Sequence, residues 1–132
     1  TESALMEHPL VAIETLARLK ALGVKLFIDD YGIGYSSLAY LQKLPVDAIK
    51  IDQSFVMGMT DRNASAAIVR STVELGHDLG LQVVAEGVES EIACERVKAL
   101  ACDVAQGYYV AKPMPASEFG AWLSESRWVS AR

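Results

Sequence analysis

The segment Val24-Lys25-Leu26-Phe27-Ile28-Asp29-Asp30-Tyr31-Gly32-Ile33-Gly34 decides the fold class of this 132-residue chain. Residues 24–28 form a short, mostly apolar segment that is rich in β-branched and aromatic side chains. This pattern predicts a strand that runs directly into two aspartates. The same pattern recurs at residues 48–52 (AIKID) and 82–86 (QVVAE), and a short strand near residues 104–105 leads into Gln106-Gly107-Tyr108. The chain therefore repeats one unit, an apolar strand that ends in polar residues.

Segments with helical periodicity separate these strands. Leucine and isoleucine recur at three-residue spacing from Pro9 to Leu22, and Gly23 follows as a stop signal. Gly80 ends a later helix in the same way. The predicted helices cover residues 9–22, 38–44, 64–79, 90–100 and 116–124. Strands that alternate with helices and are apolar almost throughout predict a parallel sheet with both faces covered.

Two α/β architectures accept this order, a doubly wound open sheet and a (β/α) barrel, and both place functional residues at the carboxyl ends of strands. Polar residues follow every strand here, and a barrel mouth would bring all four sets together. A complete barrel has eight strands and about 250 residues. We therefore expect residues 1–132 to form a single, incomplete domain, a partial TIM-like (β/α) barrel of four strand-helix units.

Composition narrows the classes of function. Apolar residues make up 52% of the chain, enough for one core, and the net charge of -5 argues against a DNA-binding surface. No apolar run reaches the roughly 20 residues that span a bilayer, and the pattern typical of a signal peptide is not seen, so none is expected. Cys94 and Cys102 are too few for a disulfide framework and are expected to be free thiols. These features predict a cytoplasmic location.

Carboxylates are the candidate metal ligands. Asp29, Asp30 and Glu86 follow neighbouring strands and suit hard cations such as Mg²⁺ or Mn²⁺, whereas no cluster of His or Cys favours zinc. Taken alone, an Asp-Asp pair is more often a solvated turn or a helix N-cap. The glycines Gly32 and Gly34 favour a loop beside a site.

Lys50 is unusual because it lies between two isoleucines in an apolar strand, on the same face as Asp52. It either forms a buried ion pair with Asp52 or a neighbouring carboxylate, or has a catalytic role. Glu86 presents a similar choice, since it could cap the next turn or face the barrel mouth. His8 and His77 are assigned no role.

Four segments carry a resemblance to a known family: 29–38 (DDYGIGYSSL), 45–52 (PVDAIKID), 85–89 (AEGVE) and 106–113 (QGYYVAKP). In this order and spacing they resemble the signatures of the EAL family, bacterial phosphodiesterases that hydrolyse cyclic di-GMP to linear pGpG. The resemblance covers nearly the whole chain and identifies it as the C-terminal half of such a domain.

The resemblance implies a β/α barrel with two Mg²⁺ or Mn²⁺ ions at its mouth. Asp29 would bridge both ions, Asp30 would bind the second, and Glu86 would bind the second ion or its water. Lys50 would contact the attacking water or the metal shell. Asp52, Glu89 and Gln106 would support the site or bind the nucleotide. Glu2 would anchor the glycine loop, which contains Gly32 and Gly34.

The chain departs from the family pattern in two ways. Tyr31 stands where the family usually has Phe, and Ile33 where it has Thr or a small residue, both mild changes. The Glu-Ala-Leu signature, the asparagine strand after it and a further metal-binding glutamate would lie before Thr1. The chain alone is therefore expected to bind metal poorly and to be inactive.

Other classes of function fit parts of the pattern. One is a non-catalytic EAL-like module that binds cyclic di-GMP or a protein partner, and another is an unrelated half-barrel or response-regulator-like domain. The retained Asp29, Asp30, Lys50 and Glu86 favour the enzyme. Half a barrel would leave two sheet edges and apolar faces uncovered, which predicts either a homodimer or a rearrangement that buries them. The complete protein is expected to carry sensory or GGDEF domains upstream and could be membrane-tethered through them.

Overall fold

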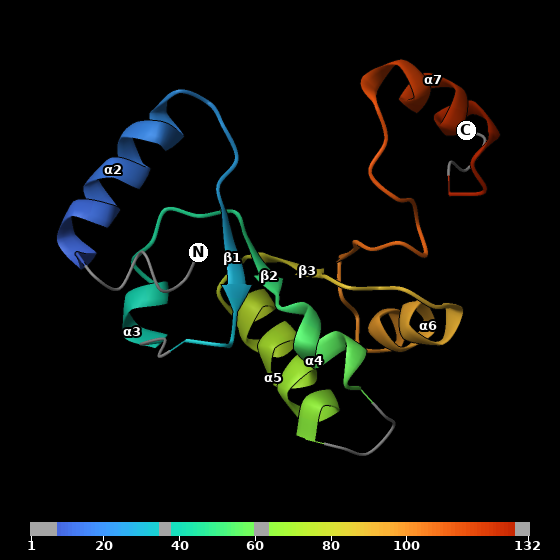
Figure 1. The fold of residues 1–132 in the computed structure, drawn as a ribbon. Coiled ribbons are helices and arrows are strands. Elements are labelled where there is room, and N and C mark those ends of the chain that lie inside the picture. The colour runs from blue at the N-terminus through green and yellow to red at the C-terminus, as the bar shows by residue number, and fades with distance from the viewer. Residues whose placement is uncertain (1–7, 35–37, 60–63, 129–132) are drawn as a thin grey trace.

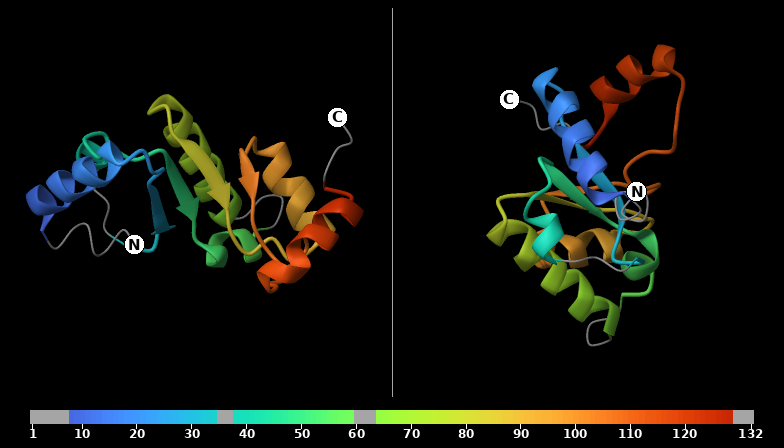
Figure 2. Two further views of the ribbon diagram at one scale, coloured as in Figure 1. Left: turned by 90° about the horizontal axis from the view of Figure 1, so that it is seen from above. Right: turned by 90° about the vertical axis from the view of Figure 1, so that its left-hand side faces the viewer.

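The computed structural model describes residues 8–34, 38–59 and 64–128. Within them, four parallel strands form one sheet in the order β1-β2-β3-β4. The strands are β1 (Phe27–Tyr31), β2 (Ala48–Ile51), β3 (Gln82–Ala85) and β4 (Val104–Ala105), and Figure 2 shows them side by side. A doubly wound sheet reverses its strand order at a switch point, whereas this order follows the chain throughout. The sheet is therefore a segment of a (β/α) barrel, as predicted.

Helices connect the strands and flank the sheet. They are α2 (Pro9–Ala21), α3 (Leu38–Leu41), α4 (Gln53–Met57), α5 (Ala64–Asp78), α6 (Glu91–Ala99) and α7 (Ala116–Glu125). Helix α5 packs against β2 and β3 and also contacts α4. Helices α2 and α7 lie away from this central layer, at opposite sides of the view in Figure 1.

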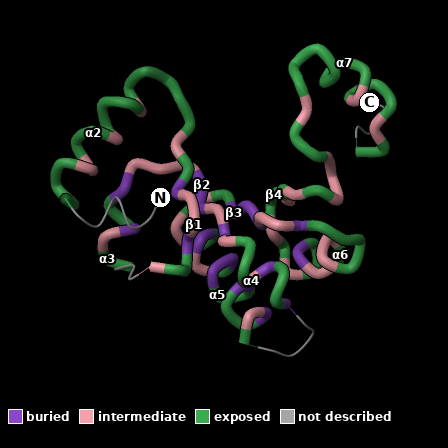
Figure 3. Tube along the Cα trace, in the orientation of Figure 1, coloured by how far each residue is buried: buried purple, intermediate pink, exposed green. Residues whose placement is uncertain are grey.

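The core lies between the sheet and α5. Ile49 and Val83 on the strands and Val69 on the helix are completely buried, and Figure 3 shows the buried residues concentrated on the strands and on the side of α5 that faces them. Gly76 lets the helix approach closely, since a Cβ at this position would lie 2.5 Å from Cγ2 of Val83. The spacing between helix and sheet thus depends on the absence of a side chain at residue 76.

Two aspartates anchor the amino ends of the strands in the same way. Asp47, just before β2, accepts a hydrogen bond from the backbone N–H of Leu26 at 2.7 Å and contacts the ammonium of Lys20. Asp103, just before β4, accepts from the backbone N–H of Val83 at 2.7 Å and contacts His77 at 3.0 Å. Both carboxylates therefore tie the start of a strand to its neighbour and to a helix.

The predicted elements are largely confirmed, with three corrections. The first strand was predicted at residues 24–28, but β1 is Phe27–Tyr31 and contains the aspartates that were placed after it. The helix predicted at residues 38–44 is the shorter α3. Helix α4 was not predicted, because five residues are too few to show helical periodicity.

Cys94 and Cys102 are both free thiols, as predicted, and both are partly buried. Burial, with the nearby charge of Asp103, raises the pKa of the Cys102 thiol to about 11, so this cysteine stays protonated at neutral pH. No helix in the described part of the chain combines the length and the apolar character needed to cross a bilayer.

Candidate metal centre at the carboxyl edge of the sheet

A β-bulge in β1 brings the two aspartates to one site. Ile28 pairs with Ile49 on β2, and the next registered pair is Tyr31 with Ile51, so β1 has one residue more than β2 over this stretch. Asp29 and Asp30 together therefore lie opposite Lys50. Asp30 accommodates the extra residue in the left-handed region, with a φ of 57°. A regular strand would point the two side chains to opposite faces.

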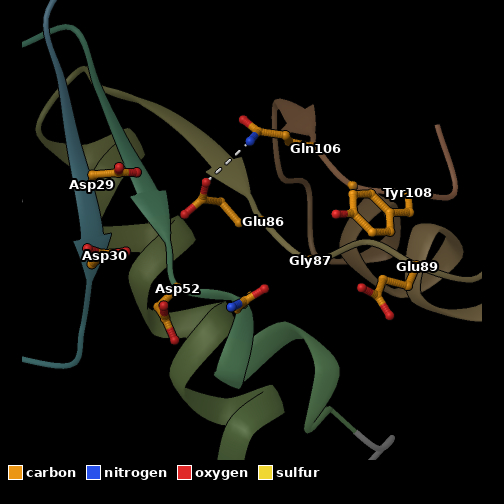
Figure 4. A pocket seen from close by; sticks show the side chains of 10 residues that line it. Asp29, Asp30, Asp52, Glu86, Gly87, Glu89, Gln106 and Tyr108 are labelled. Carbon is orange, nitrogen blue, oxygen red and sulfur yellow. Dashed lines mark hydrogen bonds between the residues drawn. The ribbon is translucent and has the colours of Figure 1, made fainter. Parts of the chain in front are cut away.

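Three carboxylates converge beside this bulge. One carboxylate oxygen from each of Asp29, Asp30 and Glu86 lies within 4.8 Å of the others, and in Figure 4 both aspartates project from β1 toward the side where Glu86 lies. Oxygen ligands at about 2.0–2.6 Å from a Mg²⁺ or Ca²⁺ ion stand up to about 4–5 Å apart across it. The cluster therefore fits a divalent cation with oxygen ligands.

Lys50 joins two of these carboxylates. Its ammonium Nζ lies 2.7 Å from Oδ1 of Asp29 and 2.6 Å from Oε1 of Glu86, and only 17% of the lysine side chain is exposed. Burial lowers the pKa of Lys50, but the hydrogen bonds to both carboxylates raise it by more, so the net shift is upward. Lys50 is thus a fixed positive charge, and its ion-pair partners are neighbouring carboxylates rather than Asp52.

Asp52 has a different structural role in the described residues. It lies just past the end of β2, and its Oδ1 accepts a hydrogen bond from the backbone N–H of Ser54 at 2.9 Å, which caps the N-terminus of α4. Asp52 also lines the pocket beside the carboxylates. Its carboxylate therefore fixes the start of a helix at the edge of the site.

Backbone hydrogen bonds hold the loops after β3 and β4 together. The N–H of Val88 donates to the carbonyl of Gln106 at 3.1 Å, and the N–H of Tyr109 donates to the carbonyl of Val88 at 3.0 Å. Gly107 permits this approach, since a Cβ there would lie 2.2 Å from the Val88 carbonyl oxygen. Across the joined loops, Nε2 of Gln106 donates to Oε1 of Glu86 at 3.4 Å. The loop pairing thus places an amide beside the third carboxylate.

These side chains line an open pocket of about 330 Å³. Six of the predicted site residues line it, namely Asp29, Asp30, Asp52, Glu86, Glu89 and Gln106. Gln53, Gly87, Gly107 and Tyr108 also line it and were not predicted as site residues. Gln53, Gly87 and Gly107 each directly follow a predicted site residue, and Tyr108 lies two residues after Gln106. Proximity in sequence to a predicted strand end was therefore the available signal for these four residues.

The glycine loop is described only in part. Gly32 has a φ of 105°, which a side chain rarely adopts, and a Cβ there would lie 3.0 Å from Cε2 of Phe55. Gly34 is partly buried. The predicted anchor of this loop, Glu2, lies outside the described residues, as do residues 35–37 of the same segment.

The fold and the site together define a class of protein. Parallel strands in chain order bring carboxylates from β1 and the end of β3, with a lysine from β2, to one edge of a (β/α) sheet. The chain belongs to the EAL domain family, whose sequence model matches residues 1–113.

Curated relatives and solved structures agree with this assignment. The chain is 52% identical over 120 residues to an uncharacterized protein of Azorhizobium caulinodans, covering 91% of this chain and 16% of that protein. It is 42% identical over 126 residues to the cyclic di-GMP phosphodiesterase RocR of Pseudomonas aeruginosa, covering 96% of this chain and 32% of RocR. A structure of the PaMucR phosphodiesterase in complex with c-di-GMP matches with a TM-score of 0.83 and 42% identity, over 87% of this chain and 47% of that one. The chain therefore spans half or less of the length of each of these three.

Proposed function

We propose that this chain contributes to hydrolysis of cyclic di-GMP to linear pGpG within a complete EAL domain. The observation that carries the proposal is the convergence of Asp29, Asp30 and Glu86 within 4.8 Å, with Lys50 bonded to two of them. The relative RocR is named a cyclic di-GMP phosphodiesterase, which supports the substrate. The product follows from cleavage of one of the two phosphodiester bonds of the ring.

Different residues of the chain have different roles in this reaction. Asp29, Asp30 and Glu86 would hold the divalent cations. When bound, such cations would supply an activated water and would stabilise charge on the attacking and leaving oxygens. Lys50 adds a fixed positive charge beside the phosphate, and Gln106 holds Glu86 in its orientation through the 3.4 Å hydrogen bond.

Substrate binding depends on the same cations, because the pocket that the chain contributes is acidic. A phosphate diester would be repelled by the five aspartates and glutamates that line this pocket unless metal ions neutralised them. Glu89 and Asp52 line the pocket beyond the cluster. We propose that these two side chains, with Gln106, face the polar edges of the nucleotide.

The proposal extends to the metal, the location and the context of the domain. The all-oxygen ligand set favours Mg²⁺ or Mn²⁺. We propose a cytoplasmic site of action. We also propose further sensory or GGDEF domains in the same protein, since two relatives are named a bifunctional diguanylate cyclase/cyclic di-GMP phosphodiesterase, MucR of Pseudomonas aeruginosa, and an oxygen sensor protein, DosP of Escherichia coli.

Self-association is also proposed, because the outer strands β1 and β4 expose Phe27 and Val104, which are 48% and 44% accessible. Light scattering of the purified protein measures this association directly.

Turnover of cyclic di-GMP by the full-length protein tests the function. We expect hydrolysis to pGpG with Mg²⁺ or Mn²⁺, none with EDTA, and losses of at least about 100-fold in kcat for Asp29→Ala and Lys50→Ala. An active protein that neither change affects contradicts the mechanism. Binding of the dinucleotide by a wild-type protein that does not hydrolyse it identifies a non-catalytic module instead.

A further inference from the structure

Helix α4 lies against the two segments that directly follow the metal ligands, the turn at Gly32 after β1 and the loop at Gly87 after β3. Its N-terminus is fixed to the end of β2 by the Asp52 cap. Its C-terminal end is held from α6, where Nη1 of Arg96 donates to the carbonyl of Met59 at 2.7 Å. Hydrogen bonds thus fix both ends of α4 to neighbouring elements. The helix therefore provides a fixed surface for the segments that pack against it.

The first loop meets α4 at a glycine. Gly32 lies two residues after Asp30, and its Cα faces the ring of Phe55 so closely that a Cβ there would come within 3.0 Å of Cε2. Phe55 is partly buried and packs against the hydrophobic core. The aromatic ring therefore limits how far the turn after the bulge can move toward α4.

The second loop also meets α4 at a glycine. Gly87 directly follows Glu86 and has a φ of 69°, and a Cβ there would lie 2.6 Å from the Cβ of Gln53 and 3.4 Å from Cγ of Met57. Both segments therefore contact the same five-residue helix, Gly32 at Phe55 and Gly87 at Gln53 and Met57. These contacts limit how far either segment can move toward α4.

We propose that Phe55 is a positioning residue for the metal centre: its ring sets the Gly32 turn, and this turn sets the distance of Asp29 and Asp30 from Glu86. This inference rests on the proposed function, since it concerns the same cations. Truncating the ring keeps every ligand residue and removes only the surface that the Gly32 turn packs against. Support of this kind around metal ligands is typically worth about 10–100-fold in metal affinity.

Mn²⁺ binding to the full-length protein tests the proposal without requiring turnover. Free Mn²⁺ is measured by electron paramagnetic resonance, and Asp30→Ala defines binding at unrelated sites. We expect Phe55→Ala to weaken the Asp30-dependent binding about 10-fold and Phe55→Leu, which restores part of the apolar surface, about threefold. The control is Leu44→Ala, a core truncation in the connection that precedes β2. It should lower the melting temperature without changing Mn²⁺ affinity.

The outcomes separate the two proposals. Equal Mn²⁺ affinity for wild type and Phe55→Leu, with Phe55→Ala unchanged or unfolded, overturns the positioning role. Equal weakening by Leu44→Ala also overturns it, because general destabilisation would then account for the effect. A wild type that binds Mn²⁺ but does not hydrolyse cyclic di-GMP contradicts only the proposed function, and the comparison of affinities still decides the role of Phe55. Absence of Asp30-dependent Mn²⁺ binding overturns both.

Discussion

Lys50 and Glu86 form an ion pair with 2.6 Å between Nζ and Oε1, and each side chain is only 17% exposed. Asp29 shares the same ammonium at 2.7 Å. One lysine thus compensates part of the charge of three carboxylates that lie within 4.8 Å of one another. Two negative charges of the cluster remain after the single positive charge of Lys50 is counted. A cation that binds in the cluster would neutralise them.

Replacing Lys50 by Met should destabilise the protein in the absence of metal. The change removes the ammonium while keeping most of the side-chain volume, so Asp29 and Glu86 lose their shared partner and repel each other. We expect the free energy of unfolding to fall by about 2 kcal/mol in EDTA. Urea unfolding monitored by fluorescence measures it. The stability gained on adding Mn²⁺ should be larger for the variant than for wild type, because Mn²⁺ replaces the missing charge.

An exposed lysine supplies the matched control for this change. Lys43→Met removes the same charge from the surface and should alter the free energy of unfolding by less than about 0.5 kcal/mol. Equal losses for the two variants would refute the role of the Lys50 ion pairs in stability.

Asp52→Ala should remove the cap of α4. The N–H of Ser54 loses its 2.9 Å hydrogen bond, and the expected loss is about 1 kcal/mol. Asp52→Ser retains a capping oxygen and should recover most of this stability. Thermal unfolding of the three proteins measures the effect. If Ser were no better than Ala at this position, the cap would not be what Asp52 contributes to stability.

Two glycine-to-alanine changes should have opposite effects. In Gly76→Ala the new methyl group would lie 2.5 Å from Cγ2 of Val83 and 3.3 Å from Cδ1 of Ile49, so overpacking should cost about 1–3 kcal/mol. In Gly120→Ala, within α7, the methyl group meets no atom within 4 Å. The higher helix propensity of alanine should then stabilise α7 by up to about 1 kcal/mol. Urea unfolding of both variants checks the signs, and a neutral Gly76→Ala would contradict the close packing of α5.

The ionisation of Asp103 should make the free energy of unfolding depend on pH in the acidic range. Burial raises the pKa of this carboxyl, but hydrogen bonds from the Val83 N–H and from His77 lower it by more, so the net shift is downward. A folded-state pKa below the unfolded value of about 3.9 means that the contribution is complete above that pH and is lost as pH falls through the folded-state pKa.

Asp103→Asn isolates this contribution, because the amide oxygen still accepts from Val83 but cannot ionise. The difference in free energy of unfolding between wild type and variant should be constant above about pH 5 and should shrink toward about pH 2.5. Urea unfolding across this range measures it. A difference that grows as the pH falls would have the wrong sign for a carboxyl with a lowered pKa.

Much of the fold could be predicted because its signals are local. The runs at residues 48–51, 82–85 and 104–105 become strands within one residue of the predicted bounds, since consecutive apolar residues suit a sheet covered on both faces. Gly23 and Gly80 follow α2 and α5 closely with φ values of 81° and 74°, because only glycine adopts this conformation without strain. The carboxylates at strand ends were also visible, as were the four motifs of the EAL family.

The sequence by itself therefore determined the order of the elements, the family and the identity of the acidic residues. The tertiary structure decided how these residues meet. The bulge that turns Asp29 and Asp30 to one side depends on the register between β1 and β2, which exists only once the strands pair. Lys50 pairs with Asp29 and Glu86 because neighbouring strands bring them within 2.7 Å, whereas Asp52 leaves the strand to cap a helix. These contacts join residues far apart in the chain, and no local pattern encodes such distances.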